Sequence, residues 1–254
     1  MQNIYEYGSE TIQDSPNLIW KGYELILESL DIVEDDVSDN RDMKKGKKVT
    51  GAIIAELFRK NIEIVLKQKY EGRYKVSENN VYVKGCHIEF DFLILRQDAK
   101  KEVITQNDIS YELPVYDSED VVAVLESKTY GIYTLYDRDK KIFENNNLYK
   151  FVSAYKDDLH GIDKKIKLGY MCLAEQRPIN GKSNFIKKTI YFFEDYFNKQ
   201  YSDSERLWNV YFAKCHYAIN NYDEYDVYAE EKQWERFVDS LLPESGTIGT
   251  KKRL

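Results

Sequence analysis

A run of five apolar residues, Val121 to Leu125, constrains the fold of this chain most strongly. Three of the five residues are β-branched, and such a run is typical of a central strand that is buried on both faces. The run passes directly into Glu126, Ser127 and Lys128. Because side chains alternate along a strand, Glu126 and Lys128 project from the same face and Ser127 from the opposite one. Burying either charge alone is costly, so the pattern indicates two charged groups with partners at the end of the strand.

A second carboxylate lies inside another apolar stretch. Asp91 stands between Phe90 and the run from Phe92 to Leu95. Two carboxylates that lie side by side repel each other unless a cation lies between them. Together with backbone carbonyls and water they form the oxygen site that Mg²⁺ prefers. A lysine beside such a metal orients a water molecule and stabilises charge that develops on a phosphate.

Hydrophobic periodicity predicts the elements around these two segments. In chain order they are a helix over 50–70, strands over 73–83 and 86–96, an irregular polar connection over 97–118, the strand that begins at Val121, a helix over 148–159 and a strand over 167–175. A turn at Lys84-Gly85 separates the first two strands. The helix over 50–70 has one apolar stripe, formed by Ile54, Leu57, Phe58, Ile62, Val65 and Leu66.

We expect one domain with decorations at both ends. Its parts are an N-terminal helix and linker over 1–48, a core over 49–176, a C-terminal extension over 177–242 and a tail over 243–254. The N-terminal helix spans about 16–33, and the linker, over 38–48, is exposed and holds the basic cluster Lys44, Lys45, Lys47 and Lys48. The extension is expected to hold a helix or strand over 185–197, a strand over 210–218, a segment over 223–228 that pairs with it, and a helix over 233–242.

The order of these elements, with Asp91 on one strand and Glu126-Ser127-Lys128 at the end of the next, resembles the αβββαβ core of the PD-(D/E)XK nuclease superfamily. These residues match the D…ExK signature of that superfamily, and the resemblance covers about residues 50–176. It implies an α/β, restriction-endonuclease-like fold with a mixed central sheet flanked by helices, an N-terminal helix and a C-terminal α+β extension. Residues 121–128 resemble the version found in restriction-like proteins of prokaryotic defence loci.

The resemblance also implies a site. Asp91 and Glu126 would bind Mg²⁺ or Mn²⁺ together with the carbonyl of Ser127, and Lys128 would position the attacking water. The chain departs from the family pattern in two respects, because no proline precedes Asp91 and because 35 residues (126 − 91) separate the two acids. An insertion over 97–118 accommodates the longer spacing.

Two further acidic residues leave alternatives open. Glu56, in the helix over 50–70, would be the extra acidic residue that the superfamily often has there, but its position opposite the apolar stripe also suits a solvated helix residue. Glu89 shares the face of Asp91 two residues earlier. Asp91 is favoured because it has apolar neighbours on both sides.

The function implied is Mg²⁺-dependent hydrolysis of nucleic acid, with DNA favoured over RNA as the substrate, in anti-phage defence or restriction. The basic cluster Lys44 to Lys48 would contact the nucleic-acid backbone. A homodimer is one expected assembly, since cutting both strands of a duplex needs two active centres; a helicase or ATPase partner is another. The alternative function is a catalytically inactive nuclease-fold subunit that docks within a larger defence or helicase assembly.

Composition limits these functions further. The net charge of −7, from 37 basic and 44 acidic residues, argues against a protein that coats nucleic acid by bulk electrostatics. No apolar run approaches the roughly 20 residues of a membrane helix, and Met1 to Glu10 lacks the features of a signal peptide. The three cysteines lack zinc-site spacing and are expected to be reduced thiols. We therefore expect a cytoplasmic protein without membrane contact.

Overall fold

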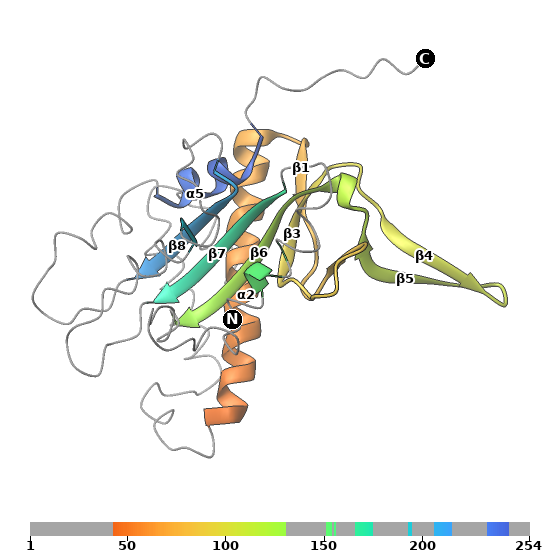
Figure 1. Ribbon diagram of the computed structural model, residues 1–254, viewed down its shortest axis with the longest axis horizontal. Helices are drawn as coiled ribbons and strands as arrows, with labels where there is room; N and C mark the ends of the chain where they lie inside the picture. The colour runs from red at the N-terminus through yellow and green to blue at the C-terminus, as the bar shows by residue number, and fades with distance from the viewer. Residues whose placement is uncertain are drawn as a thin grey trace, which may run out of the picture.

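The computed structural model describes the chain in seven stretches, 43–130, 151–153, 155, 166–174, 193–194, 206–214 and 233–243. Within them lies a mixed five-stranded sheet, with helices α2 and α5 on one face and a two-stranded arm that projects from its side (Figure 1). The prediction of a mixed α/β chain with a mixed sheet is therefore confirmed. The predicted helix over 16–33 and the segment over 223–228 lie outside the described residues, as does nearly all of 185–197.

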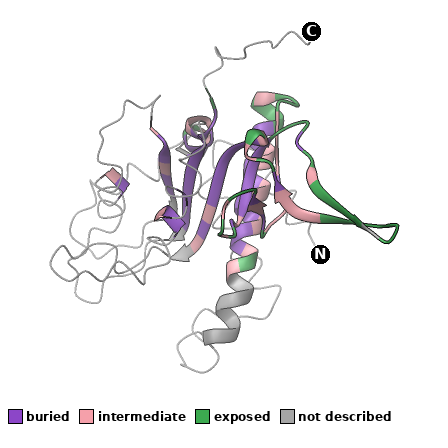
Figure 2. Ribbon diagram, turned by 45° about the vertical axis from the view of Figure 1, so that its right-hand side comes forward, coloured by how far each residue is buried: buried purple, intermediate pink, exposed green. Residues whose placement is uncertain are grey.

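The five strands lie in the order β1-β3-β6-β7-β8. Their bounds are β1 Tyr74–Val76, β3 Phe92–Arg96, β6 Val121–Tyr130, β7 Lys167–Ala174 and β8 Trp208–Lys214. The pairs β1–β3 and β3–β6 are antiparallel, whereas β6–β7 and β7–β8 are parallel. Strand β6 is thus central, and its first five residues are buried, as their apolar run predicts (Figure 2).

Helix α2 (Met43–Tyr70) covers one face of this sheet with the predicted stripe, whose six residues are all buried. Helix α5 (Gln233–Leu241) packs beside it through Trp234, Phe237, Val238 and Leu241. The two helices are joined where Asp239 accepts hydrogen bonds from Lys69 Nζ and from the Tyr70 hydroxyl, both at 2.7 Å. No helix in these stretches is long and apolar enough to cross a membrane.

Helix α2 begins earlier than the sequence predicts. Residues 43–48 belong to its first turns, so the prediction of a linker over 38–48 is wrong for this part. Lysine and methionine favour helix even without apolar periodicity, and periodicity is required only where a helix packs on a core. The basic cluster Lys44, Lys45, Lys47 and Lys48 therefore lies on helix α2, with side chains outside the described set.

The connection over 97–118 is not irregular. It forms β4 (Lys101–Gln106) and β5 (Ile109–Tyr116), an antiparallel hairpin that we call the arm and that extends away from the sheet (Figure 1). Asn107 and Asp108 turn the chain with φ of 51° and 62°, the left-handed values of a tight hairpin turn. A second small sheet forms because β2 (Tyr82–Val83) pairs parallel with β5, and the 3₁₀ helix η4 (Ser118–Asp120) leads into β6.

The predicted strands over 73–83 and 86–96 are shorter than expected. The first divides into β1 and β2, which belong to different sheets, and β3 begins only at Phe92. The turn at Gly85 is present, with φ +85° and a hydrogen bond of 2.9 Å from the Cys86 N–H to the Val83 carbonyl. Alternation from Ile88 onward favours a strand, but before Phe92 only Phe90 pairs across, with Val81.

The opposite face of the sheet carries a second apolar core. It joins side chains of β6, β7 and β8 to residues 81–90 and to Phe151, Val152, Tyr155 and Phe193. Residues 151–153 are helical, within the helix predicted over 148–159. Strands β7 and β8 and helix α5 match their predictions closely, so part of the predicted C-terminal extension completes the central sheet.

Candidate active site

The two acidic segments meet beside the first residue of β3, at the end of its pairing with β6. We call this place the sheet edge. Phe92, the first residue of β3, pairs with Leu125 of β6. Asp91 precedes Phe92 and Glu126 follows Leu125, so in this antiparallel pair the two acids leave the buried part of the sheet together. The predicted association of Asp91 with the Glu-Ser-Lys segment therefore follows from the pairing of two buried strands.

Asp91 is attached directly to the backbone of β6. Its Oδ2 accepts a hydrogen bond of 2.6 Å from the Ser127 N–H and one of 2.7 Å from the Ser127 hydroxyl. Ser127 is buried, and its two donors hold the Asp91 carboxylate against β6. The family resemblance implies a role only for the Ser127 carbonyl. In the structure the N–H and the hydroxyl of Ser127 also have a role, because both donate hydrogen bonds to Asp91.

Glu126 and Lys128 form an ion pair on the face opposite helix α2, as the alternation of side chains predicts. Burial raises the pKa of Glu126 to about 7, and the negative charge of Asp91 adds to this effect while Lys128 opposes it. Burial alone would lower the pKa of Lys128, but the charges of Glu126 and Asp91 outweigh burial and raise it. Lys128 thus stays protonated and acts as a donor and a positive charge.

Two residues of β7 lie opposite this pair, and sequence analysis did not single them out. Across the parallel β6–β7 pair, Tyr170 faces Glu126 and Cys172 faces Lys128. The Tyr170 hydroxyl is fully buried and forms no hydrogen bond to a described nitrogen or oxygen atom. Burial raises its pKa well above the usual value, and the nearby Cys172 and Glu126 add to the shift. Alternation along β7 puts Tyr170 and Cys172 on one face, but only the register shows what they face.

Glu89 lies close by and is exposed. Its carboxylate accepts a hydrogen bond of 2.8 Å from the Tyr82 hydroxyl, and its charge contributes slightly to the raised pKa of Glu126. Asp91, by contrast, bonds the segment between Glu126 and Lys128. Asp91 rather than Glu89 is thus the acidic residue bonded to this segment, and the choice of Asp91 as the metal ligand stays a prediction.

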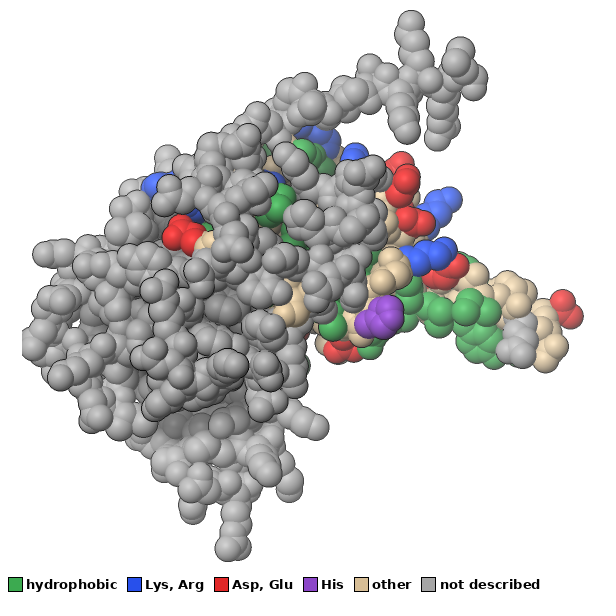
Figure 3. Space-filling view, viewed as in Figure 1, with side chains coloured by type: hydrophobic (Ala, Val, Ile, Leu, Met, Phe, Trp, Pro, Cys, Tyr) green, Lys and Arg blue, Asp and Glu red, His purple; other side chains and the backbone are tan. Residues whose placement is uncertain are grey.

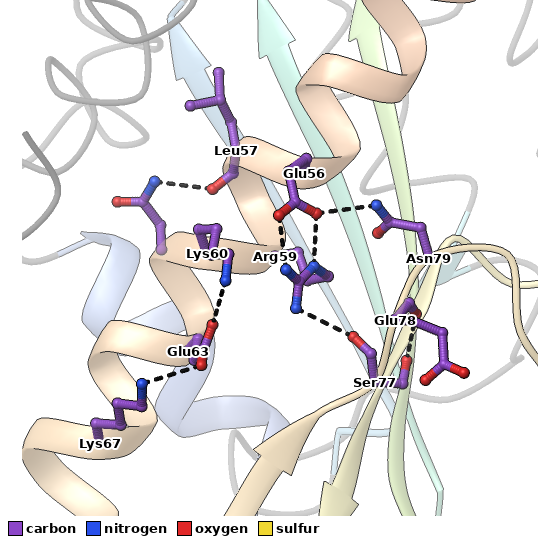
Figure 4. A network of polar contacts seen from close by, with 10 residues as sticks. Glu56, Leu57, Arg59, Lys60, Glu63, Lys67, Ser77, Glu78 and Asn79 are labelled. Carbon is purple, nitrogen blue, oxygen red and sulfur yellow. Dashed lines mark hydrogen bonds and ion pairs between the residues drawn. The ribbon is translucent and has the colours of Figure 1, made fainter. Parts of the chain in front are cut away.

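Glu56 has a different set of partners (Figure 4). Arg59 donates to its two carboxylate oxygens from Nε and Nη2, each at 2.7 Å, and Asn79 Nδ2 donates at 3.0 Å. Burial alone would raise the pKa of Glu56, but the hydrogen bonds and charge of Arg59 outweigh it and lower the pKa. No described hydrogen bond or ion pair joins Glu56 to Asp91, Glu126 or Lys128.

The carboxylate oxygens of Asp91 and Glu126 are ligands of the kind that a hard cation such as Mg²⁺ prefers. Among the residues that the structure describes, no three His, Cys, Asp or Glu side chains gather around one point. Mg²⁺ often binds through only one or two carboxylates and keeps several waters, so Asp91 and Glu126 with a backbone carbonyl form a sufficient set. The repulsion that helps to raise the pKa of Glu126 is the interaction that a cation between the two groups would relieve.

Comparisons with known proteins are sparse. No family model and no curated protein matches the chain. Two solved structures of NucC from E. coli MS115-1 are similar to it, each at 13% sequence identity. The match to the cAAA-bound form has a TM-score of 0.38 and covers 78% of this chain and 75% of the NucC chain. The match to the apo form has a TM-score of 0.32 and covers 74% of this chain and 75% of the NucC chain.

Proposed function

We propose that this chain is a metal-dependent nuclease that hydrolyses DNA phosphodiester bonds. The observation that carries the proposal is the convergence of Asp91 with Glu126, Ser127 and Lys128 at one sheet edge. The two carboxylates lie close enough for the charge of one to raise the pKa of the other, and a protonated lysine lies beside them. Phosphoryl transfer needs such a concentration of charge around a dissociating phosphate more than it needs a covalent catalyst.

Each side chain has a role in this proposal. Asp91, Glu126 and the Ser127 carbonyl would hold Mg²⁺ or Mn²⁺, which when bound polarises the phosphate and makes a bound water more acidic. Ser127 fixes the Asp91 carboxylate through its N–H and hydroxyl. Lys128 would exchange its ion pair with Glu126 for a hydrogen bond to the attacking water or the phosphate, which it would donate as a positively charged group.

The biological setting is part of the same proposal. The resemblance of residues 121–128 to restriction-like proteins of prokaryotic defence loci supports a role in anti-phage defence or restriction, in the cytoplasm. The basic cluster Lys44, Lys45, Lys47 and Lys48 would contact the DNA backbone from the first turns of helix α2. DNA is the proposed substrate, and a homodimer is the proposed assembly.

Calorimetric titration with Mn²⁺ and Mg²⁺, beside cleavage assays on plasmid, single-stranded DNA and RNA, tests the proposal. The double variant Glu126→Ala/Lys128→Ala is expected to lose both metal binding and cleavage. The double variant Glu63→Ala/Lys67→Ala is a matched control, because it removes another Glu–Lys ion pair, of 3.1 Å, on helix α2. The control is expected to behave as the wild type does.

The opposite result favours the second candidate, an inactive nuclease-fold subunit. One observation supports that candidate, since Asp91 and Glu126 already have protein partners in Ser127 and Lys128 and no third acidic ligand joins them in the described stretches. A folded wild type that binds neither metal and cleaves none of the three substrates would overturn the nuclease proposal. Cleavage that survives in the Glu126→Ala/Lys128→Ala variant would overturn the assignment of the site.

A further inference from the structure

We propose that Glu56 and Arg59 form a positioning clamp that fixes the backbone around Asp91, and that Glu56 is a positioning residue rather than a metal ligand. The structural part of this inference stands by itself, and its catalytic consequence rests on the proposed function. The clamp consists of the two hydrogen bonds of 2.7 Å from Arg59 to Glu56 and the bond of 3.0 Å from Asn79 to Glu56 (Figure 4).

The clamp holds residues 77–81 against helix α2. Besides the Asn79 contact, Arg59 Nη1 donates to the Ser77 carbonyl at 3.4 Å. Asn80 follows with φ of 60°, a left-handed conformation that asparagine adopts more readily than most residues. The bonds from helix α2 to Ser77 and Asn79, directly before this residue, tether the segment, so residues 77–81 depend on Glu56 and Arg59 for their position.

Residues 77–81 in turn bind the backbone on both sides of Asp91. The Asn80 N–H donates to the Asp91 carbonyl at 2.9 Å, and Val81 and Phe90 exchange two backbone hydrogen bonds of 3.0 and 2.8 Å. On the other side, the Leu93 N–H donates to the Ser77 hydroxyl at 2.9 Å. Because Asp91 lies between these bonds, movement of residues 77–81 displaces its carboxylate relative to β6.

The carboxylate oxygens of Glu56 are occupied in a way that disfavours a metal. Oε1 accepts from Arg59, and Oε2 accepts from both Arg59 and Asn79. A bidentate arginine pair is among the stronger hydrogen-bonded arrangements in proteins, and its positive charge competes with any cation for the same oxygens. Glu56 therefore acts on the site through residues 77–81 and not by direct ligation.

Amide hydrogen exchange tests the clamp without reference to catalysis. Glu56→Gln and Arg59→Met are each expected to accelerate exchange at the Asn80, Val81 and Phe90 amides by about tenfold or more, since opening of this segment no longer breaks the clamp. Glu63→Gln is the matched control, because Glu63 also pairs with basic residues on helix α2, at 3.2 and 3.1 Å, and is expected to leave these amides unchanged. Unchanged exchange in both clamp variants would overturn the proposal.

Kinetics and metal titration then separate positioning from ligation. A positioning role predicts that Glu56→Gln and Arg59→Met both lower kcat by about 10- to 100-fold with KM for DNA unchanged, the usual range for groups that orient a metal ligand. A ligand role predicts instead that Glu56→Gln is inactive while Arg59→Met keeps wild-type Mn²⁺ affinity and kcat, and that result would overturn the proposal.

If Arg59→Met does not fold, Asn79→Ala replaces it with the same expectation. If the wild type binds no metal, the proposed function is overturned but the clamp is not, because the hydrogen-exchange result decides separately whether the clamp exists.

Discussion

The edge of the sheet around Asp91 and the β4–β5 arm both reverse the usual distribution of side chains, but they do so in opposite ways. At the sheet edge, charged side chains are largely buried, with Glu126 at 13% and Lys128 at 29% exposure. On the arm, apolar side chains are about half exposed, at 54% for Ile109 and 51% for Tyr111, and Figure 3 shows hydrophobic side chains along it. Burying the charges costs free energy, and exposing the apolar side chains gains none, so each region has residues that folding alone does not select.

The two regions differ in how they are supported. Hydrogen bonds connect the sheet edge from helix α2 through residues 77–81 and Asp91 to β6. The arm has its own ladder and, at its base, the contacts of Glu78 with Lys101 and Tyr116. A change at the sheet edge or in its core therefore acts on the whole fold, whereas a change on the arm acts locally.

The largest expected effect compares two aromatic residues. Phe58 of helix α2 is fully buried and stacks on Trp234, with ring centroids 5.7 Å apart. Phe58→Ala is expected to lower the free energy of unfolding by about 3–5 kcal/mol, because a large core side chain leaves a cavity. Tyr111→Ala, on the arm, is expected to change it by less than about 0.5 kcal/mol. Urea unfolding followed by fluorescence measures both, and a Tyr111→Ala loss as large as that of Phe58→Ala would break the comparison.

A second pair of variants applies one substitution at two glycines. A Cβ at Gly169 in β7 would lie 3.0 Å from side-chain atoms of both Leu125 and Leu241, so these side chains between helix α5 and the sheet would have to shift to make room for it. Gly169→Ala is expected to destabilise the fold by about 1–3 kcal/mol through overpacking. Gly51→Ala in helix α2 has nothing within 4 Å and is expected to stabilise by up to about 1 kcal/mol. Calorimetric melting of the two variants gives the signs, and equal signs would contradict the packing argument.

How far the sequence predicts the fold depends on burial. Strands β6, β7 and β8, helix α5 and the packed part of helix α2 are predictable because each buries an apolar pattern with a clear period. The arm escapes prediction because Val103 and Ile104, neighbours on opposite faces, are both exposed and leave no alternation to detect. The turn residues Asn107 and Asp108, between the β-branched run Val103 to Thr105 and Ile109, are the signal that the sequence offers.

The candidate site is predictable to a similar extent. Asp91, Glu126 and Lys128 stand out as charges inside apolar strands, and strand order brings them together. The partners of Glu56 do not stand out, because Asn79 lies in a segment whose path depends on contacts with both a helix and a strand. Tyr170 has no polar neighbours in sequence that mark it, and its place opposite Glu126 follows from the register of two strands far apart in the chain.

The junction between arm and sheet offers a test with a pH dependence. Burial alone would raise the pKa of Glu78, but the hydrogen bonds from Lys101 and Tyr116, each 2.7 Å, outweigh burial and lower the pKa below 4.5. Because the folded-state pKa lies below the unfolded value, these contacts stabilise the protein above about pH 4.5, and the stabilisation is lost as the pH falls through the folded pKa.

Glu78→Gln is therefore expected to destabilise by about 1 kcal/mol at pH 7, with the difference from wild type fading as both are titrated into acid. Urea unfolding at a series of pH values measures this difference. Glu112→Gln is the control, because Glu112 is well exposed and lies 3.8 Å from the same Lys101. A difference between Glu78→Gln and wild type that stays constant into acid would show that the charge of Glu78 is not what joins arm and sheet.

The smallest effect is expected at the tip of the arm, where the independence of the two regions is tested most directly. Asp108 has φ of 62°, a conformation that costs an aspartate little, a glycine nothing and a β-branched residue most. Asp108→Gly is expected to slow hydrogen exchange of the β4 and β5 amides by a factor that corresponds to about 0.5 kcal/mol, and Asp108→Val to accelerate it by more than that. Neither variant is expected to change exchange in β6 or β7, because the strain is released or added in a hairpin whose ladder opens without the sheet. If Asp108→Val accelerates exchange in β6 as much as in β4, the arm unfolds with the sheet as one cooperative unit, and its exposed apolar face is then part of what holds the fold together.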